Sequence, residues 1–305
     1  MPGSQFAFRG DDGERLLGRR WLPQSRPLAI VQIAHGLAEH SARYGRLAQA
    51  LNAAGYGVYA NDHRGHGPSA APADLGHFAD REGWTKCVGD LWSFNRVIAA
   101  EQPSLPIVFL GHSLGSFLGR DFVSQHSKAL AGAAFSGSNG RPPAIATLGR
   151  LIARIERMRL GRRGKSRLIF QMWFGDFNKP FQPARTEFDW LSRDAKEVDA
   201  YVADPLCGFP FTNQLAIDVL DALPRVTAPE SLAAIRKDMP IYVFSGERDP
   251  VGSNLKGFIA DLQAASFTKL TTKIYPGARH ETLNETNRDE VTRDFIGWLD
   301  SVIGK

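Results

Sequence analysis

A serine between two glycines is the first group in this chain whose setting predicts chemistry. Gly111–Gly115 (GHSLG) matches the pattern G-x-S-x-G. The apolar run 106–110 ends directly before it, and a helical pattern, 114–124, begins directly after Ser113. In a strand–turn–helix setting this pentapeptide is typical of a nucleophile elbow, a tight turn that exposes the serine. We therefore expect Ser113 to be a nucleophile; the alternative is an idle serine in a glycine-rich turn.

A serine hydroxyl is a weak nucleophile and needs a neighbouring base. Of the eight histidines, only His126 and His280 follow Ser113, as the usual order of serine, acid and histidine requires. His126 falls at the end of the helix expected after the nucleophile, where it would point away. His280 lies in a loop after the strand pattern 270–275. Because catalytic groups in parallel sheets lie beyond the carboxyl ends of strands, we expect His280 to be the base.

The base needs an acidic residue to orient it, and the loop after the strand pattern 241–244 carries two candidates. Asp249 lies farther from the strand end and precedes Pro250, which fixes the turn. We expect Asp249 to be the acid, with Glu247 as the alternative.

Acyl transfer also requires two backbone N–H groups that point at the developing oxyanion. One comes from the residue after the nucleophile, here Leu114. The other comes from the loop that follows the apolar run 28–34, where we expect the N–H of Leu37 to be the second donor. The side chains of His35 and Glu39 are expected to brace this loop by hydrogen bonds rather than to contact substrate.

The candidate catalytic groups all follow expected strands, so a single sheet must bring them together. Two short strands are expected in the first 22 residues, and buried-strand patterns then alternate with helical ones. Such alternation predicts an α/β fold with a mostly parallel sheet flanked by helices. Between residues 140 and 223 the strand patterns stop, and aromatic and arginine-rich helical stretches replace them. We therefore expect a core domain of residues 1–139 and 224–305 and a helical cap of residues 140–223. The strand patterns are 28–34, 57–60, 106–110, 130–135, 241–244 and 270–275, and the helical ones are 41–54, 84–100, 114–124, 255–265 and 288–303.

The composition excludes several classes of protein. With 305 residues, 43% of them hydrophobic and 23% charged, the chain is not disordered. A net charge of +5 from 37 cations and 32 anions is not a nucleic-acid signature. Cys87 and Cys207 form no CxxC pair, so we expect free thiols and no metal site. Without an 18-residue apolar run or the apolar core of a signal peptide, a cytoplasmic protein is expected.

Five ordered blocks of the sequence resemble those of α/β-hydrolases of the monoacylglycerol lipase and lysophospholipase type. The resemblance covers most of the chain and implies an α/β-hydrolase fold that needs no cofactor or metal. It also implies a triad of Ser113, Asp249 and His280, with Leu37 and Leu114 as oxyanion donors. The blocks are His35–His40 (HGLAEH), Asp62–Ser69 (DHRGHGPS), Gly111–Gly115 (GHSLG), the stretch with LSRD, EVD and DPL in 191–206, and the segments 246–249 and 273–280.

Together these inferences predict a serine ester hydrolase that cleaves single-chain acyl esters, such as monoacylglycerols or lysophospholipids, through an acyl-enzyme. A general carboxylesterase, a thioesterase or an acyltransferase would use the same residues, and a peptidase is a further alternative. A basic binding protein that retains an inactive hydrolase fold is the alternative from another class. Dehalogenases and epoxide hydrolases of this fold are excluded, because they carry an aspartate where this chain has Ser113. The oligomeric state stays open.

The expected cap begins with a basic amphipathic helix, which departs from the more purely apolar membrane-docking caps of the family. Apolar residues stand at 148, 151, 152, 155 and 158, and arginines at 150, 154 and 157. Two interpretations stay open: transient contact of the arginines with an anionic lipid surface, or a helix packed on the core with its basic face in solvent. Trp173 and Phe174 are expected either to wall an acyl-binding cleft or to form the cap's own core.

Overall fold

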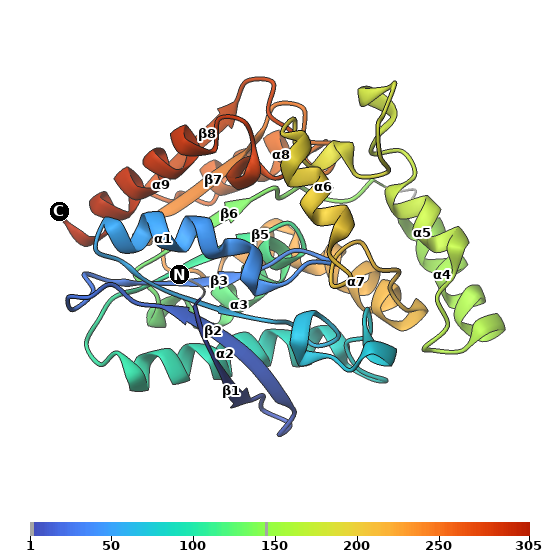
Figure 1. Cartoon of the computed structure of the whole chain (residues 1–305), viewed down its shortest axis with the longest axis horizontal. Coiled ribbons are helices and arrows are strands. Elements are labelled where there is room, and N and C mark those ends of the chain that lie inside the picture. The colour runs from blue at the N-terminus through green and yellow to red at the C-terminus, as the bar shows by residue number, and fades with distance from the viewer. Residues whose placement is uncertain (1–2, 144–145) are drawn as a thin grey trace.

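The computed structural model describes residues 3–143 and 146–305, which form an eight-stranded sheet between layers of helices (Figure 1). The strand order is β1-β2-β4-β3-β5-β6-β7-β8. The pairs β1·β2 and β2·β4 are antiparallel, and the remaining pairs are parallel. The predicted mostly parallel α/β sheet is thus confirmed. The strands are β1 (Ser4–Arg9), β2 (Arg15–Trp21), β3 (Ile30–Ala34), β4 (Gly57–Asn61), β5 (Ile107–His112), β6 (Gly132–Ser136), β7 (Ile241–Gly246) and β8 (Leu270–Tyr275).

Helices cover both faces of the sheet, as Figure 1 shows. On one face lie α1 (Gly45–Ala53) and α9 (Arg288–Ile303), and on the other lie α2 (Gly83–Glu101), α3 (Leu114–His126) and α8 (Leu255–Ala264). Every residue of the inner strands β3 to β7 is buried, because apolar side chains on both faces pack against these helices. This two-sided burial explains why these strands are continuous apolar runs in the sequence.

In the described part of the chain, four α-helices follow β6 and precede β7 in the sequence, and they lie at the edge of the sheet where the parallel strands end (Figure 1). They are α4 (Ala146–Leu160), α5 (Arg167–Phe174), α6 (Ala195–Ala203) and α7 (Asn213–Val226). The last of them, α7, continues past the expected cap boundary at residue 223. Among the described residues, no helix combines the length and apolar character that crossing a membrane requires.

The arginines of α4 have partners that the sequence did not indicate. Its arginines reach toward α7: Arg150 Nε donates to Asp221 at 2.9 Å, Arg154 lies 3.3 Å from the same carboxylate, and Arg157 Nη1 donates to Gln214 at 3.1 Å. These arginines nevertheless stay in contact with solvent, since the side chains of Arg150 and Arg154 are 33% and 51% exposed. The helix pattern alone does not reveal the polar partners that α7 supplies. Four apolar side chains of α4 are also exposed, by 47% to 77%: Leu148, Leu151, Ile155 and Met158.

The turn between β5 and α3 is held by close backbone packing. Ser113 has φ of 51° and ψ of −121°, in a region that non-glycine residues rarely adopt. A Cβ on Gly115 would lie 2.1 Å from the carbonyl oxygen of Ala34, and one on Gly111 would lie 2.4 Å from that of Gly115. Only glycine fits at these two positions, so the motif glycines let α3 approach the neighbouring strand β3.

We predict that Gly115→Ala destabilises the fold by about 1–3 kcal/mol, because the new methyl group meets backbone that has no room to move. The matched control is Gly297→Ala in α9, where an added Cβ meets nothing within 4 Å. There the higher helix propensity of alanine should add about 0.5–1 kcal/mol of stability. Urea unfolding followed by circular dichroism measures both. Equal stability of the two variants would show that the close approach at Gly115 does not constrain the fold.

Candidate active site

The predicted nucleophile, base and oxyanion donors lie on the wall of one cavity of about 490 Å³. Ser113 and Leu114 follow β5, Leu37 follows β3, and His280 follows β8. The cavity lies between the carboxyl ends of these strands and the helices α4, α5 and α7, whose side chains complete its wall. Residues far apart in the sequence therefore meet where the topology of a parallel sheet places ligand sites.

His280 and Asp249 form a buried hydrogen-bonded pair. His280 Nδ1 lies 2.8 Å from Asp249 Oδ1, and both side chains are almost fully buried. The other carboxylate oxygen accepts a hydrogen bond from Ser245 Oγ at 2.8 Å, and the backbone N–H of Val251 donates to Oδ1 at 2.9 Å. An ionised carboxylate can only accept, so the Nδ1 proton lies toward Asp249 and the lone pair of Nε2 is free.

The alternative acid, Glu247, is not in contact with the imidazole. Its side chain is exposed, and Glu247 Oε2 accepts a hydrogen bond from the backbone N–H of Gly277 at 2.8 Å. His126, the alternative histidine, stacks on Trp92 with ring centroids 4.1 Å apart. Of the two candidate acids and the two candidate histidines, the structure therefore brings only Asp249 and His280 together.

The environment shifts the pKa values of this pair in opposite directions. Burial alone would raise the pKa of Asp249, but the charge of His280 and hydrogen bonds from His280, Ser245 and Val251 outweigh it and lower the pKa. Burial alone would lower the pKa of His280, but Asp249, with smaller contributions from Glu281 and Glu39, outweighs it and raises the pKa. Relative to a free histidine, the site therefore stabilises the imidazolium beside a carboxylate, which is the charge state that proton transfer from a serine would create.

Ser113 and His280 share the cavity wall, although no hydrogen bond joins the Ser113 hydroxyl to the imidazole among the described residues. The His112 ring packs against the His280 ring at 4.8 Å, and Trp190 lies on it at 5.1 Å. The two rings pack against the imidazole and limit its movement. In such sites the hydrogen bond often tightens only when substrate binds, so we expect it to form in the substrate complex.

Two backbone N–H groups are free to bind an anion beside Ser113. Within the described residues, neither Leu37 nor Leu114 donates its backbone N–H to a protein acceptor. Leu114 is the first residue of α3, where the helix dipole favours negative charge. Leu37 follows Gly36, at which an added Cβ would lie 3.2 Å from Ser113 Cβ.

The loop that carries Leu37 is braced by its own side chains. Glu39 Oε1 accepts a hydrogen bond from the backbone N–H of Gly36 at 2.6 Å. His35 Nδ1 donates to the Gly36 carbonyl at 2.8 Å, and His35 Nε2 accepts from the backbone N–H of His63 at 3.0 Å. Both side chains thus have the expected bracing contacts, and Glu39 also reaches the cavity wall.

The rest of the cavity wall is largely apolar and aromatic. Trp173 and Phe174 both line it, and both also belong to the cap's aromatic packing. Trp173 packs edge-on against Phe211 at 5.2 Å, and Phe174 stacks on Trp190 at 5.9 Å. The two interpretations of these residues, cleft wall and cap core, therefore describe the same surface. Other apolar side chains of the wall are Phe117, Ile169, Phe170, Val219, Leu220 and Leu223.

Sequence reasoning missed Arg43 and Glu281 as parts of the site. Arg43 donates two hydrogen bonds to the Glu281 carboxylate at 2.6 and 2.7 Å, and Glu281 lines the cavity beside His280. The position of Glu281 directly after the expected base was a usable signal. Nothing in the helical pattern 41–54 marks Arg43, because charged residues in such patterns usually face solvent.

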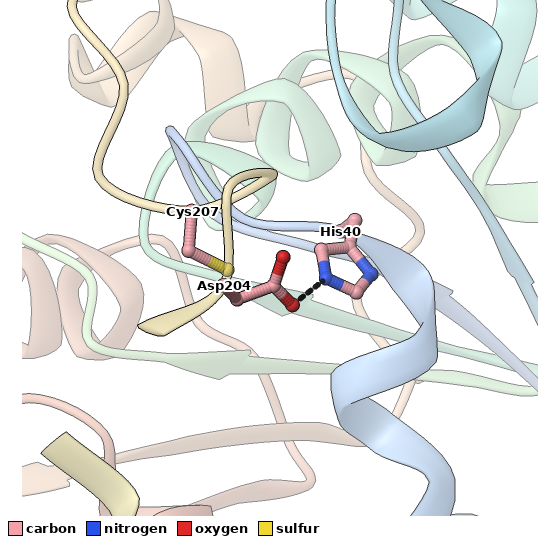
Figure 2. A group of neighbouring side chains, drawn as sticks. All are labelled: His40, Asp204 and Cys207. Atoms are coloured by element: carbon pink, nitrogen blue, oxygen red, sulfur yellow. Dashed lines mark hydrogen bonds and ion pairs between the residues drawn. The ribbon is translucent and has the colours of Figure 1, made fainter. Parts of the chain in front are cut away.

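One cluster of metal-ligating side chain types lies beside the site, and Figure 2 shows its three members. His40 Nε2, Asp204 and Cys207 Sγ place their ligand atoms within 4.8 Å of one another. However, His40 Nε2 donates to Asp204 at 2.8 Å, and burial raises the pKa of the Cys207 thiol, so the thiol keeps its proton. A metal-bound histidine normally donates its other N–H, yet buried His40 Nδ1 has no partner among the described residues. The chemistry favours a hydrogen-bonded link between the Leu37 loop and the cap.

Comparisons with known proteins agree with this architecture. The family model described as serine aminopeptidase, S33, matches residues 25–287. A monoacylglycerol lipase from Mycolicibacterium smegmatis is 30% identical, with 97% of this chain and 96% of the relative covered. A monoglyceride lipase from Mus musculus is 28% identical over 95% of this chain and 87% of the relative.

A solved structure shows the same fold. A thermostable carboxyl esterase from Bacillus coagulans, determined in complex with glycerol, superposes with a TM-score of 0.90. Its sequence is 27% identical, and the match covers 99% of each chain. The family model covers most of the sequence, and both the sequence relatives and the structure align along nearly the whole chain. The chain therefore belongs to the serine aminopeptidase S33 family of hydrolases, with the α/β-hydrolase fold and a close likeness to monoacylglycerol lipases.

Proposed function

We propose that this serine ester hydrolase cleaves single-chain acyl esters of the monoacylglycerol or lysophospholipid type. The observation that carries the proposal is the cavity, which brings Ser113, His280 and two free N–H groups onto the same wall as an apolar aromatic surface. An ester carbonyl beside Ser113 would have its acyl chain against apolar side chains. The relatives named monoacylglycerol lipase, and the esterase determined with glycerol, support a glycerol-sized alcohol.

The proposed mechanism assigns one role to each group. Ser113 Oγ attacks the ester carbonyl while His280 Nε2 takes its proton, and the N–H groups of Leu37 and Leu114 hold the oxyanion. Asp249 fixes the His280 tautomer and stabilises the imidazolium. His280 then protonates the leaving alcohol, and the acyl-enzyme remains on Ser113. Water, activated by the same imidazole, releases the fatty acid and restores the serine.

We infer that residues 140–223 act as a lid that selects the acyl chain. The cap supplies Trp173, Phe174 and their apolar neighbours to the wall, whereas the groups assigned to catalysis come from the sheet. A cavity of about 490 Å³ lies within the range of about 300–1,000 Å³ that small-molecule sites occupy. The cap is therefore expected to set chain-length preference without taking part in bond cleavage.

The family's description names an aminopeptidase, but the charges of the site favour an ester. An aminopeptidase needs a free anionic group for the ammonium of the peptide N-terminus. Among the described residues, the carboxylates that line the cavity are those of Glu39 and Glu281. Both already bind Arg43, at 2.8 and 2.6 Å, so neither is free to bind a second cation.

A substrate panel tests this proposal. We expect hydrolysis of monooleoylglycerol and lysophosphatidylcholine and none of leucine p-nitroanilide, because an apolar wall without a free carboxylate does not hold a peptide amine. Ser113→Ala should lower ester hydrolysis by about 10³-fold or more while the protein stays folded. Ester cleavage by Ser113→Ala within tenfold of the parent would reject the nucleophile. Preferential cleavage of the anilide would instead favour the aminopeptidase.

We further propose that the outer face of the cap contacts the lipid that carries the substrate. The exposed apolar side chains of α4, together with Leu168 and Met172 of α5, form a surface that borders the cavity, since Met172 and Gly149 line it. Such a surface would bring the cavity next to aggregated substrate.

Because Cys87 and Cys207 are unpaired, we place the protein in a reducing compartment, the cytoplasm, as a peripheral enzyme.

Glutamate in place of Leu151 and Met158 tests the lipid contact. Each residue would bury an apolar side chain worth about 1.5–3 kcal/mol, so binding to phosphatidylcholine vesicles should fall by about tenfold or more. Hydrolysis of soluble p-nitrophenyl butyrate should stay unchanged. Leu22→Glu is the control, because Leu22 is similarly exposed just after β2, away from the cap. If the double variant binds vesicles as the parent does, the lipid contact is rejected.

A further inference from the structure

We propose that Arg43 is a positioning residue which, through Glu39 and Glu281, holds the oxyanion loop in register with the base His280. The oxyanion loop is here the segment His35–His40. The inference rests on the roles proposed above for Ser113 and His280 and goes beyond them, because Arg43 itself touches neither substrate nor reacting atoms.

The guanidinium of Arg43 joins two loops that are far apart in the sequence. On one side it binds both oxygens of Glu281, the residue directly after His280, at 2.6 and 2.7 Å. On the other side it binds Glu39 Oε2 at 2.8 Å. Glu39 in turn accepts the backbone N–H of Gly36 at 2.6 Å, one residue before the proposed donor Leu37. A continuous chain of charge-assisted hydrogen bonds thus connects the oxyanion loop to the base.

This cluster is buried, which makes its geometry well defined. Arg43, Glu39 and Glu281 have side chains that are 12% exposed or less. The Tyr201 ring of the cap covers the guanidinium at 4.8 Å, and the Tyr44 hydroxyl donates to Glu39 Oε1 at 3.1 Å. Buried ion pairs contribute little to net stability, because desolvation offsets their attraction. What the bidentate contact with Glu281 does provide is a fixed geometry, which a lysine cannot reproduce.

The cluster also places charge next to the base. One cation and two carboxylates leave a net charge of −1 beside His280. The charged and titratable groups around His280 are Asp249 from the β7–α8 loop, Glu281 from its own loop, Glu39 from the oxyanion loop and His112 at the end of β5. Glu281 and Glu39 both raise the pKa of His280, after Asp249. Changes in the cluster should therefore move the acid limb of the pH–rate profile, which a purely structural contact would not do.

The test is the pH dependence of kcat/KM for p-nitrophenyl butyrate in Glu281→Gln, Arg43→Met and Arg43→Lys. Because His280 must be neutral to accept a proton, activity rises as pH rises through its pKa. Glu281→Gln removes a negative charge and should move the acid limb to lower pH. Arg43→Met removes the cation and should move it to higher pH. Arg43→Lys keeps the charge, so the limb should stay in place while kcat falls by about tenfold or more, up to about 10².

Glu281→Gln is the variant most certain to fold, since it keeps the shape of the side chain and leaves Arg43 paired with Glu39. Arg96→Met is the control, because Arg96 pairs with Asp11 on the exposed surface of α2. It should leave both the limb and kcat unchanged. An unmoved acid limb in Glu281→Gln, or parental kcat in Arg43→Lys, would overturn the inference. Ser113→Ala, assayed in parallel, separates the two proposals: if it retains activity, the proposed function itself fails.

Discussion

The hydrogen bond between His280 and Asp249 is the interaction on which the rest of the site depends. Both side chains are buried, and a buried carboxylate without partners would be strongly unfavourable. Asp249 is stable there because His280, Ser245 and the N–H of Val251 all donate to it. The sheet makes this arrangement available: β7 and β8 are parallel neighbours, so the loops that follow them emerge side by side. The orientation of the imidazole follows from that pairing.

Around this pair, Arg43 joins the oxyanion loop to the loop of His280, because it binds Glu39 in one and Glu281 in the other. Arg43 pairs with both carboxylates that line the cavity among the described residues, Glu39 and Glu281, so neither is left without a cationic partner. The cap then covers that cavity with aromatic side chains and leaves apolar side chains of α4 exposed. On the proposed function, specificity would therefore have two separate sources, the charge balance at the sheet edge and the apolar packing of the cap.

The sequence was sufficient for those features that lie directly after buried strands. Continuous apolar runs in the sequence indicate strands that are buried on both faces. These runs predicted the sheet, the elbow at Ser113 and the loop positions of Asp249 and His280. The sequence favoured Asp249 but kept Glu247 as an alternative, because both follow β7 within a few residues, and the structure brings only Asp249 into contact with His280. The partners of α4 could not be predicted, since helical periodicity separates two faces without showing which one has partners. Its partner Asp221 lies 71 residues from Arg150, and Arg43 and Glu281 are 238 residues apart.

The most direct test of the central pairing is a comparison of Asp249→Asn with Glu247→Gln. The two substitutions remove the same charge from the same loop, but only Asp249 contacts His280. Asparagine would hold the imidazole in the wrong tautomer, so kcat/KM for p-nitrophenyl butyrate should fall by about 10⁴-fold. Glu247→Gln should stay within about twofold of the parent, because its exposed carboxylate binds only a backbone N–H. A larger loss in Glu247→Gln, or a loss below about tenfold in Asp249→Asn, would contradict the assignment of Asp249 as the acid that orients the base.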